Sequence, residues 1–166
     1  MKIFSMIKLP DLVTLGNAVS GLTSMYFSVT GNYFYAAYAM ILAIAFDYSD
    51  GKVARLLKKG GKLGKDIDSL ADGISFGAAP AVLIFSMFRT PLSFFFGALV
   101  MSCGILRLAR FNVIEFKGYY VGVPIPFTAA IFPILVFLKV GFPEFAVASV
   151  AISYLMISDH QVKKAI

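Results

Sequence analysis

The stretch LVTLGNAVSGLTSMYFSVTGNYFYAAYAMILAIAF, residues 12–46, contains no charged residue. One helix of that length would extend about 50 Å at ~1.5 Å per residue, well beyond a bilayer core of about 30 Å. Thr30-Gly31-Asn32 has the composition of a turn and divides the stretch. It therefore predicts two membrane-spanning helices, over residues 12–29 and 33–57.

The rest of the chain continues this pattern. Hydrophobic residues make up 59% of its 166 residues and charged residues 14%, with a mean hydropathy of +0.83. A soluble domain carries about 25% charged residues, so a soluble enzyme, a disordered chain and a nucleic-acid-binding domain are poor interpretations. Turns near Arg89 and Gly141 separate further apolar runs. We expect an all-α polytopic membrane protein, one domain over 1–166, with four more helices over 65–88 and 91–111, from near 124–126 to 139, and over 143–158.

Lysine and arginine positions predict how these six helices are oriented. With a cytosolic N-terminus, only Arg89 and Lys139 lie on the outer side, and the other 13 of the 15 basic residues lie in the cytosol or at its surface. This asymmetry follows the positive-inside rule. We therefore expect a multi-pass cell-membrane protein with both termini cytosolic. The net charge of +6 then reflects topology and contact with anionic lipid rather than nucleic-acid binding.

Acidic residues are concentrated where the second and third helices reach the cytosolic surface. Five of the nine acids lie between residues 47 and 72. Asp47 and Asp50 are three residues apart on one helix, and Asp68 and Asp72 are four apart on the next, so each pair shares a helix face. At ~1.5 Å per residue, all four reach a similar depth.

Four convergent carboxylates need cations to neutralise them. Oxygen ligands of this kind suit Mg²⁺, Mn²⁺ or Ca²⁺, whereas zinc would call for His or Cys ligands. The competing interpretation is an ion-pair network with Lys52, Arg55 and Lys65 that only joins the two helices. Gly51 and Ala54 favour a ligand site, because their small side chains leave room on the same face.

The spacing of these residues resembles a known signature. Asp47-x-x-Asp50-Gly51-x-x-Ala54-Arg55, followed after eight residues by Gly64-x-x-x-Asp68-x-x-x-Asp72, matches every defining position of the CDP-alcohol phosphotransferase family. Residues 10–17, 68–72, 75–80, 107–112 and 122–126 further resemble the small integral-membrane phosphatidylserine synthases. Asp11 stands where those proteins often have Asn, and Tyr48-Ser49 replace a more usual Gly-Leu-type pair.

The resemblance implies a reaction and a partial set of site residues. Such enzymes transfer a phosphatidyl group from CDP-diacylglycerol to the hydroxyl of L-serine and release CMP. The four aspartates would hold two divalent cations, Mg²⁺ or Mn²⁺, with Ca²⁺ as an alternative or non-productive ion, and Asp72 would be the general base. Family members commonly form homodimers, so we expect one here.

Substrate contacts are expected around the aspartates. The serine carboxylate needs a cation, and Arg107 and Arg110 lie at the depth of the acids. We expect the serine site to comprise Arg110, Asn112 and Lys117. Arg107 is expected there, at a donor phosphate, or in a structural pair with an acid. Contacts to the CDP-lipid are expected from Thr14, Asn17, Gly51, Ala54, Arg55, Gly64, Lys65 and Asp68. For Thr14 and Asn17, a polar contact between helices is an equal alternative.

Three alternatives stay open at this point. The acceptor could be another alcohol, such as glycerol phosphate or inositol phosphate, although those substrates usually call for a denser basic pocket. The donor could be an archaeal ether lipid, which would give archaetidylserine. Clustered intramembrane aspartates also occur in cation transporters, but transport predicts acids near the midplane and access from both sides.

Overall fold

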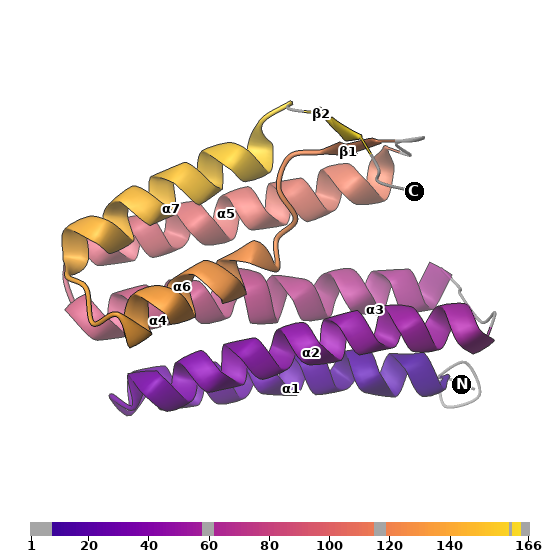
Figure 1. Cartoon of the computed structure of the whole chain (residues 1–166), viewed down its shortest axis with the longest axis horizontal. Coiled ribbons are helices and arrows are strands. Elements are labelled where there is room, and N and C mark those ends of the chain that lie inside the picture. The colour runs from indigo at the N-terminus through magenta and orange to yellow at the C-terminus, as the bar shows by residue number, and fades with distance from the viewer. Residues whose placement is uncertain (1–7, 58–61, 115–118, 160, 164–166) are drawn as a thin grey trace.

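The computed structural model describes residues 8–57, 62–114, 119–159 and 161–163, and within these ranges the chain is almost entirely helical (Figure 1). The elements are α1 (Leu9–Val29), α2 (Tyr33–Leu57), α3 (Lys62–Asp72), η2 (Gly73–Ala78), α4 (Ala79–Phe88), α5 (Pro91–Val113), β1 (Tyr119–Val121), α6 (Phe127–Phe137), α7 (Phe142–Ile157) and β2 (Gln161–Lys163). Three of these elements, α3, η2 and α4, form one continuous helical rod from Lys62 to Phe88, which we call the middle rod; its central segment, η2, is π-helical.

The all-helical class is confirmed, and the described helical rods coincide with the expected segments apart from small shifts at their ends. The fifth expected helix, predicted to begin near residues 124–126, is α6, which begins at Phe127 directly after Pro126. The strands β1 and β2 were not expected. They pair antiparallel, with Tyr119 opposite Lys163 and Val121 opposite Gln161. Strands of three residues carry too little alternation to be recognised from sequence.

Local sequence explains where the rods begin and end. Proline stands in the first turn of α1, α4, α5 and α7, where its missing N–H costs nothing. Thr90 and Ser93 form a reciprocal capping box at the start of α5, with both N–H to Oγ distances at 3.0 Å. Gly31 adopts a φ of +81° in the turn between α1 and α2, which confirms the break expected there.

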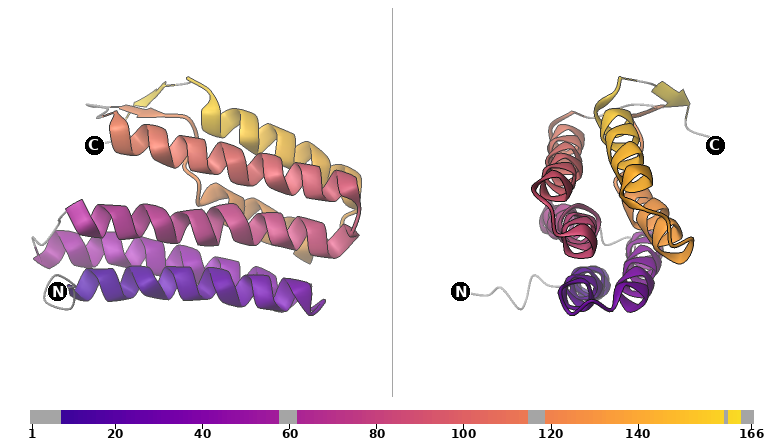
Figure 2. Two further views of the ribbon diagram at one scale, coloured as in Figure 1. Left: turned by 180° about the vertical axis from the view of Figure 1, so that it is seen from behind. Right: turned by 90° about the vertical axis from the view of Figure 1, so that its left-hand side faces the viewer.

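The rods lie roughly parallel in two layers. Seen end-on in Figure 2, α5 and the α3–η2–α4 rod lie on one side, and α2, α6 and α7 lie on the other, with α1 against α2 and the middle rod. The core between them is built from the buried side chains of Met40, Phe76, Leu83, Phe132 and Phe145. At Gly21 the backbones of α1 and η2 approach so closely that a Cβ atom would lie 2.6 Å from Ser75 Cα.

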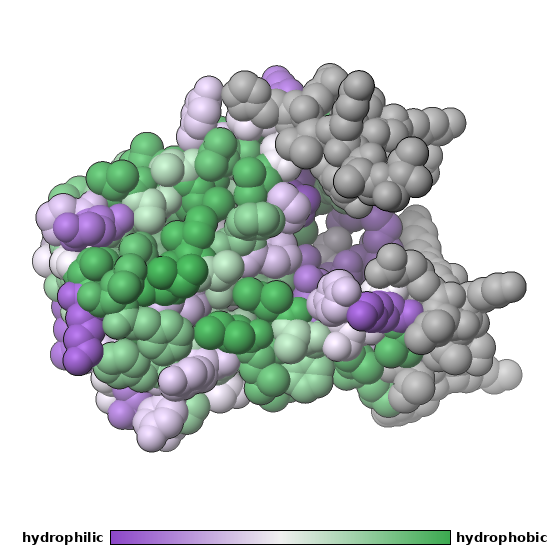
Figure 3. Space-filling model, viewed as in Figure 1, coloured by the Kyte–Doolittle hydropathy of each residue, from purple (hydrophilic) through white to green (hydrophobic). Residues whose placement is uncertain are grey.

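The outer surface of the rods is apolar. Two described helices, Leu63–Phe88 and Pro91–Val113, are long and apolar enough to cross a membrane. The face of α1 that points away from the bundle is also lined by exposed large apolar side chains at helical spacing: Leu12, Leu15, Val19, Leu22, Tyr26 and Val29. Hydrophobic residues likewise dominate the face shown in Figure 3. Such continuous apolar surface is what lipid contact requires.

The short helix α6 leaves a hollow at one end of the molecule. The beginning of α1, the end of α2, the beginning of α3 and the end of α5 lie at this end (Figure 1). Between the α5–α7 pair and the lower helices, hydrophilic side chains gather in a hollow (Figure 3). The acids expected from the sequence belong to the helices that border it.

Candidate functional site

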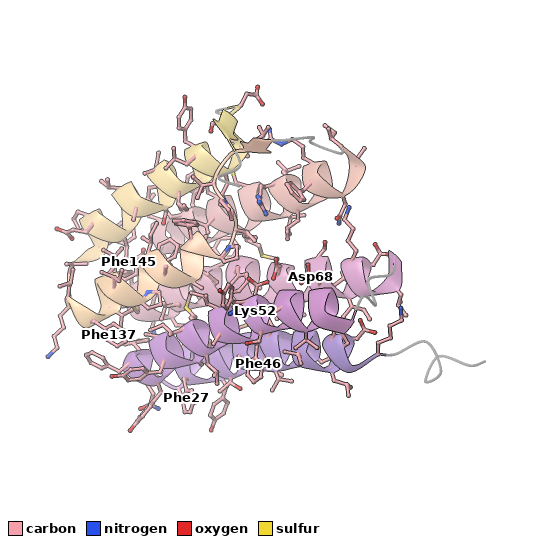
Figure 4. The ribbon with its side chains drawn as sticks, turned by 45° about the vertical axis from the view of Figure 1, so that its right-hand side comes forward. Phe27, Phe46, Lys52, Asp68, Phe137 and Phe145 are labelled. Carbon is pink, nitrogen blue, oxygen red and sulfur yellow. The ribbon has the colours of Figure 1, made fainter. Side chains whose placement is uncertain are left out.

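Two helices bring three carboxylates together. Asp47 and Asp50 of α2 and Asp68 of α3 each offer one oxygen, and these oxygens lie within 4.8 Å of one another. Asp50 is 6% exposed, and the other two are half-buried. Figure 4 shows Asp68 on α3 close to α2, beside the hollow. The i,i+3 spacing on α2 thus places both of its acids toward α3.

Asp72 lies one turn beyond Asp68 and extends the group. It is 8% exposed and interacts electrostatically with Asp47, Asp68 and Asp50. It is not one of the three residues whose oxygens lie within 4.8 Å of one another. Asn17 of α1 donates a hydrogen bond from Nδ2 to Asp72 Oδ1 over 3.1 Å. Asp72 therefore lies beside the cluster and is bonded to a third helix.

Helix α1 supplies a second donor to the acids. Thr14 Oγ1 donates to Asp50 Oδ2 over 2.7 Å, and Thr14 is 4% exposed. Thr14 and Asn17 are three residues apart, so one face of α1 orients an acid on α2 and an acid on the middle rod. The sequence predicted either nucleotide contacts or polar contacts between helices for both residues, and these two hydrogen bonds are contacts between helices. The available signal was two polar residues at i,i+3 spacing, although α1 also carries other buried polar side chains such as Ser20 and Ser24.

The donor set fits a divalent cation. Asp47, Asp50 and Asp68 provide only carboxylate oxygens, which hard cations such as Mg²⁺, Mn²⁺ and Ca²⁺ prefer. The spacing of their oxygens allows one ion to contact all three. Negative charges this close repel one another strongly in a partly buried site. A cation would remove that repulsion, and Asp72 could join from the neighbouring turn.

The ion-pair alternative finds little support among the described side chains. Lys52 Nζ lies 4.3 Å from the centroid of the Tyr48 ring, and Lys52 and Lys65 are both exposed. The side chain of Arg55 lies outside the described part of the chain. The cation that does interact electrostatically with Asp72 and Asp47 is Arg107 of α5.

Arg107 and Arg110 have different surroundings despite their i,i+3 spacing. Arg107 is 9% exposed, its Cζ lies 5.2 Å from the Phe111 ring centroid, and its Nε has no hydrogen-bond partner among the described residues. Arg110 donates to main-chain oxygens and to Asp159, with distances of 3.1–3.4 Å, and so joins α5 to the end of α7 and to β1: Val121 O, Ile157 O, Ser158 O and Asp159 Oδ1.

The residues expected to bind the substrate serine lie in different surroundings. Arg107 lies with the acids, whereas the donors of Arg110 are engaged by the end of α7. Asn112 Nδ2 donates to Ser69 Oγ over 2.9 Å at an apolar groove of about 570 Å³ between α3–η2 and α5. Ser69 lies about 100° around α3 from Asp68 but only about 60° from Asp72. Lys117 lies outside the described residues. A serine contact from Arg110, Asn112 or Lys117 stays a prediction.

The expected donor contacts are placed as follows. A Cβ atom on Gly51 would meet nothing within 4 Å, so α2 has open space beside Asp50. A Cβ atom on Gly64 would lie 3.0 Å from Asp11 Oδ1, so Gly64 permits close contact between α3 and α1. Lys65 is exposed, and the side chain of Ala54 lies outside the described part. Roles for these residues in binding a nucleotide stay predictions.

Comparisons with known proteins match this chain to one family over most of its length. The family model described as CDP-alcohol phosphatidyltransferase matches residues 7–158. Archaetidylserine synthase of Methanothermobacter thermautotrophicus is 45% identical over 170 residues, covering 95% of this chain and 70% of that protein. CDP-diacylglycerol–serine O-phosphatidyltransferase of Methanocaldococcus jannaschii is 36% identical, covering 92% and 72%. The protein of that name from Bacillus subtilis is 33% identical, covering 90% and 86%.

The carboxylate cluster predicts opposite effects of charge removal with and without metal. We expect Mn²⁺ or Mg²⁺ to raise the thermal unfolding temperature of the purified protein by several degrees, since about 1 kcal/mol shifts it by ~2–4 °C. Asp68→Asn should abolish this rise. In EDTA the same variant should be more stable than wild type, because one repelling charge is gone.

Asp66→Asn is the matched control for that measurement. Asp66 is an exposed acid of α3 that lines the apolar groove rather than the cluster. Its variant should retain the metal-dependent rise. A wild-type protein whose unfolding temperature is unchanged by either cation would contradict a metal site here.

Proposed function

The chain belongs to the CDP-alcohol phosphatidyltransferase family, and from this premise we propose that it transfers the phosphatidyl-type group of a CDP-activated lipid to the hydroxyl of L-serine. The observation that carries the proposal is the cluster of Asp47, Asp50 and Asp68 beside Asp72, at the spacing of the family signature. The names of all three relatives described above specify serine or archaetidylserine. This favours serine over a phosphorylated acceptor alcohol, and family membership leaves the transporter alternative without support.

We propose that the four aspartates hold two divalent cations, Mg²⁺ or Mn²⁺. Bound there, the cations would neutralise charge on the diphosphate of the donor. The reaction forms a bond between serine Oγ and the β-phosphorus and breaks the bond from that phosphorus to the oxygen that leaves with CMP. Asp72 accepts the hydroxyl proton. Its position one turn from Asp68, attached to Asn17, supports a role distinct from that of the other three acids.

Arg107 is the cation we assign to a substrate anion. It is nearly buried beside Asp72 and Asp47, and its Nε lacks a partner among the described residues. A guanidinium can form two parallel hydrogen bonds to a carboxylate or a phosphate. The serine carboxylate or a donor phosphate would satisfy it. Arg110, Asn112 and Lys117 remain candidates for the outer part of the serine site.

The donor nucleotide is assigned to the space beside α2. The open space at Gly51 supports this placement, and we propose further contacts from Ala54, Arg55, Gly64, Lys65 and Asp68. The lipid part of the donor is either a diacylglycerol or an archaeal ether lipid. The chemistry at phosphorus is the same for both, and the names of the relatives include both product types.

We further propose that the chain is one domain, spans the cell membrane six times and forms a homodimer. The apolar outer faces of the rods support the spans, and the distribution of lysine and arginine supports cytosolic termini. The acid cluster would then lie at the cytosolic face, where serine is available. Exposed aromatic side chains such as Phe94 and Phe95 of α5 offer apolar surface for a second copy.

The proposed reaction is tested by following CMP release from purified protein with Mn²⁺ and a panel of alcohols. L-serine should give the highest rate, and glycerol 3-phosphate and inositol 1-phosphate should give little. CDP-diacylglycerol and its ether-lipid analogue, compared under the same conditions, identify the donor. A preference for a phosphorylated acceptor would refute the assignment of serine.

Substitution of two acids separates the base from the metal ligands. Asp72→Asn keeps an oxygen that can contact a cation but cannot accept the serine proton at neutral pH. We expect CDP-lipid and metal binding to stay near normal by calorimetry, and turnover to fall by roughly 10²- to 10⁴-fold. Asp47→Asn, the control, should weaken metal binding together with turnover. Equal loss of binding in both variants would make Asp72 mainly a ligand.

Topology is tested by labelling single cysteines from each side of sealed vesicles. In a Cys103→Ser background, Lys62→Cys should react with a membrane-impermeant maleimide from the cytosolic side and Lys139→Cys from the outer side. Cys103 is buried, so its replacement should not disturb the surface. Labelling of both positions from one side would contradict the six-span arrangement.

A further inference from the structure

We propose that Asn17 is a positioning residue that acts on the reaction through Asp72 and does not touch the nucleotide; this rests on the function proposed above. Asn17 is fully buried, with 0% of its surface exposed. Its Nδ2 donates to Asp72 Oδ1 over 3.1 Å. A substrate cannot contact a side chain that the protein covers completely. The bond to Asp72 is therefore the route by which Asn17 influences the site.

The main chain of Asn17 is bonded to the same rod. Ser75 Oγ donates to Asn17 O over 2.8 Å, so α1 is attached to the rod at two residues, Asp72 and Ser75, that lie three positions apart. Asp72 immediately precedes the π-helix, and Ser75 lies within it. One turn further along α1, Gly21 allows its backbone to contact Ser75 directly. These contacts fix the rotation of the rod at the point where Asp72 projects.

The π-helix makes this fixation necessary. A π-helical turn inserts an extra residue into an α-helix and changes the rotational phase of the residues on either side of it. At the next residue of the segment, Thr128 Oγ1 of α6 donates to Phe76 O over 2.6 Å. The π-helix is thus held at two consecutive residues, by α1 through Ser75 and by α6 through Phe76. Asp72, at the end of α3, then has one direction relative to Asp47 of α2.

The free oxygen of Asn17 argues against a role in packing alone. Among the described residues Asn17 Oδ1 has no hydrogen-bond partner. A buried unsatisfied amide oxygen destabilises a fold, and an apolar side chain of similar size would avoid that cost. The amide orientation is also constrained, because Oδ1 facing the carboxylate would place two acceptors together. What the amide provides is a donor to one oxygen of Asp72, which leaves Oδ2 to receive the serine proton.

The first variant for the test is Asn17→Leu, which has a similar size and no donor. We expect it to fold and to retain the Mn²⁺-dependent rise in unfolding temperature, because Asp47, Asp50 and Asp68 are unchanged. Its kcat should fall about tenfold to a hundredfold, the effect of losing a hydrogen bond to a charged group. The KM values for CDP-lipid and serine should stay within about threefold of wild type.

Ser24→Ala is the matched control. Ser24 lies two turns along α1 from Asn17, is also fully buried, and its Oγ also lacks a partner among the described residues. It is not bonded to Asp72. Its replacement should leave kcat and both KM values unchanged. A large increase in the KM for CDP-lipid in Asn17→Leu would instead make Asn17 a donor-site residue and overturn the proposal.

A double-mutant cycle distinguishes positioning from general destabilisation. In an Asp72→Asn background, Asn17→Leu should cause no further loss of turnover, because the group through which it acts is already disabled. A merely structural role predicts the same fractional loss in both backgrounds, and that result would refute the proposal. If Asn17→Leu does not fold, Asn17→Ser replaces it in the cycle, with the same two outcomes.

Turnover in the double-mutant cycle is measured with whichever alcohol the wild-type protein accepts. A wild-type protein that prefers another acceptor would overturn the assignment of serine and leave the coupling between Asn17 and Asp72 measurable. If the protein is active with serine but the cycle shows no coupling between Asn17 and Asp72, the role proposed for Asn17 is refuted and the proposed function is not.

Discussion

Mutual repulsion of carboxylates in a partly buried site is the constraint on which the rest of this structure depends. Asp47, Asp50 and Asp68 present oxygens within 4.8 Å of one another, and Asp72 lies beside them. Such an arrangement forms only if the helices that carry the acids are held together by other contacts. It persists at low cost only when cations neutralise it. The apolar packing of the rods supplies the first condition, and bound divalent cations would supply the second.

Helix α1 carries none of the clustered acids, yet its side chains orient two of them. Thr14 and Asn17 each donate a hydrogen bond to an acid on a different helix. Gly21 lets α1 approach η2 closely, one turn from the point where Asn17 reaches Asp72. The same helix presents an apolar stripe outward. One segment thus combines lipid-facing surface with the orientation of reactive groups, since the two functions occupy different helix faces.

The sequence predicted the helices because charge-free runs and turn residues such as Gly31 are local signals. It predicted the meeting of Asp47, Asp50 and Asp68 because helix periodicity and depth can be counted along the chain. It did not predict the role of Arg110, whose partners at Ile157 and Asp159 are 47 and 49 residues away. The π-helix and the partner of Asn17 were not predicted for the same reason: they depend on which helices pack together. Depth estimates placed Arg107 and Arg110 alike, but depth does not give direction around a helix.

The central claim is that α2 and the α3–η2 rod together form a divalent-cation site. It is tested most directly by anomalous scattering from crystals of the protein grown with Mn²⁺. The account predicts anomalous peaks among the carboxylates of Asp47, Asp50, Asp68 and Asp72, and their loss in Asp68→Asn. Well-ordered carboxylates without an anomalous peak between them, at a Mn²⁺ concentration that supports CMP release, would contradict it.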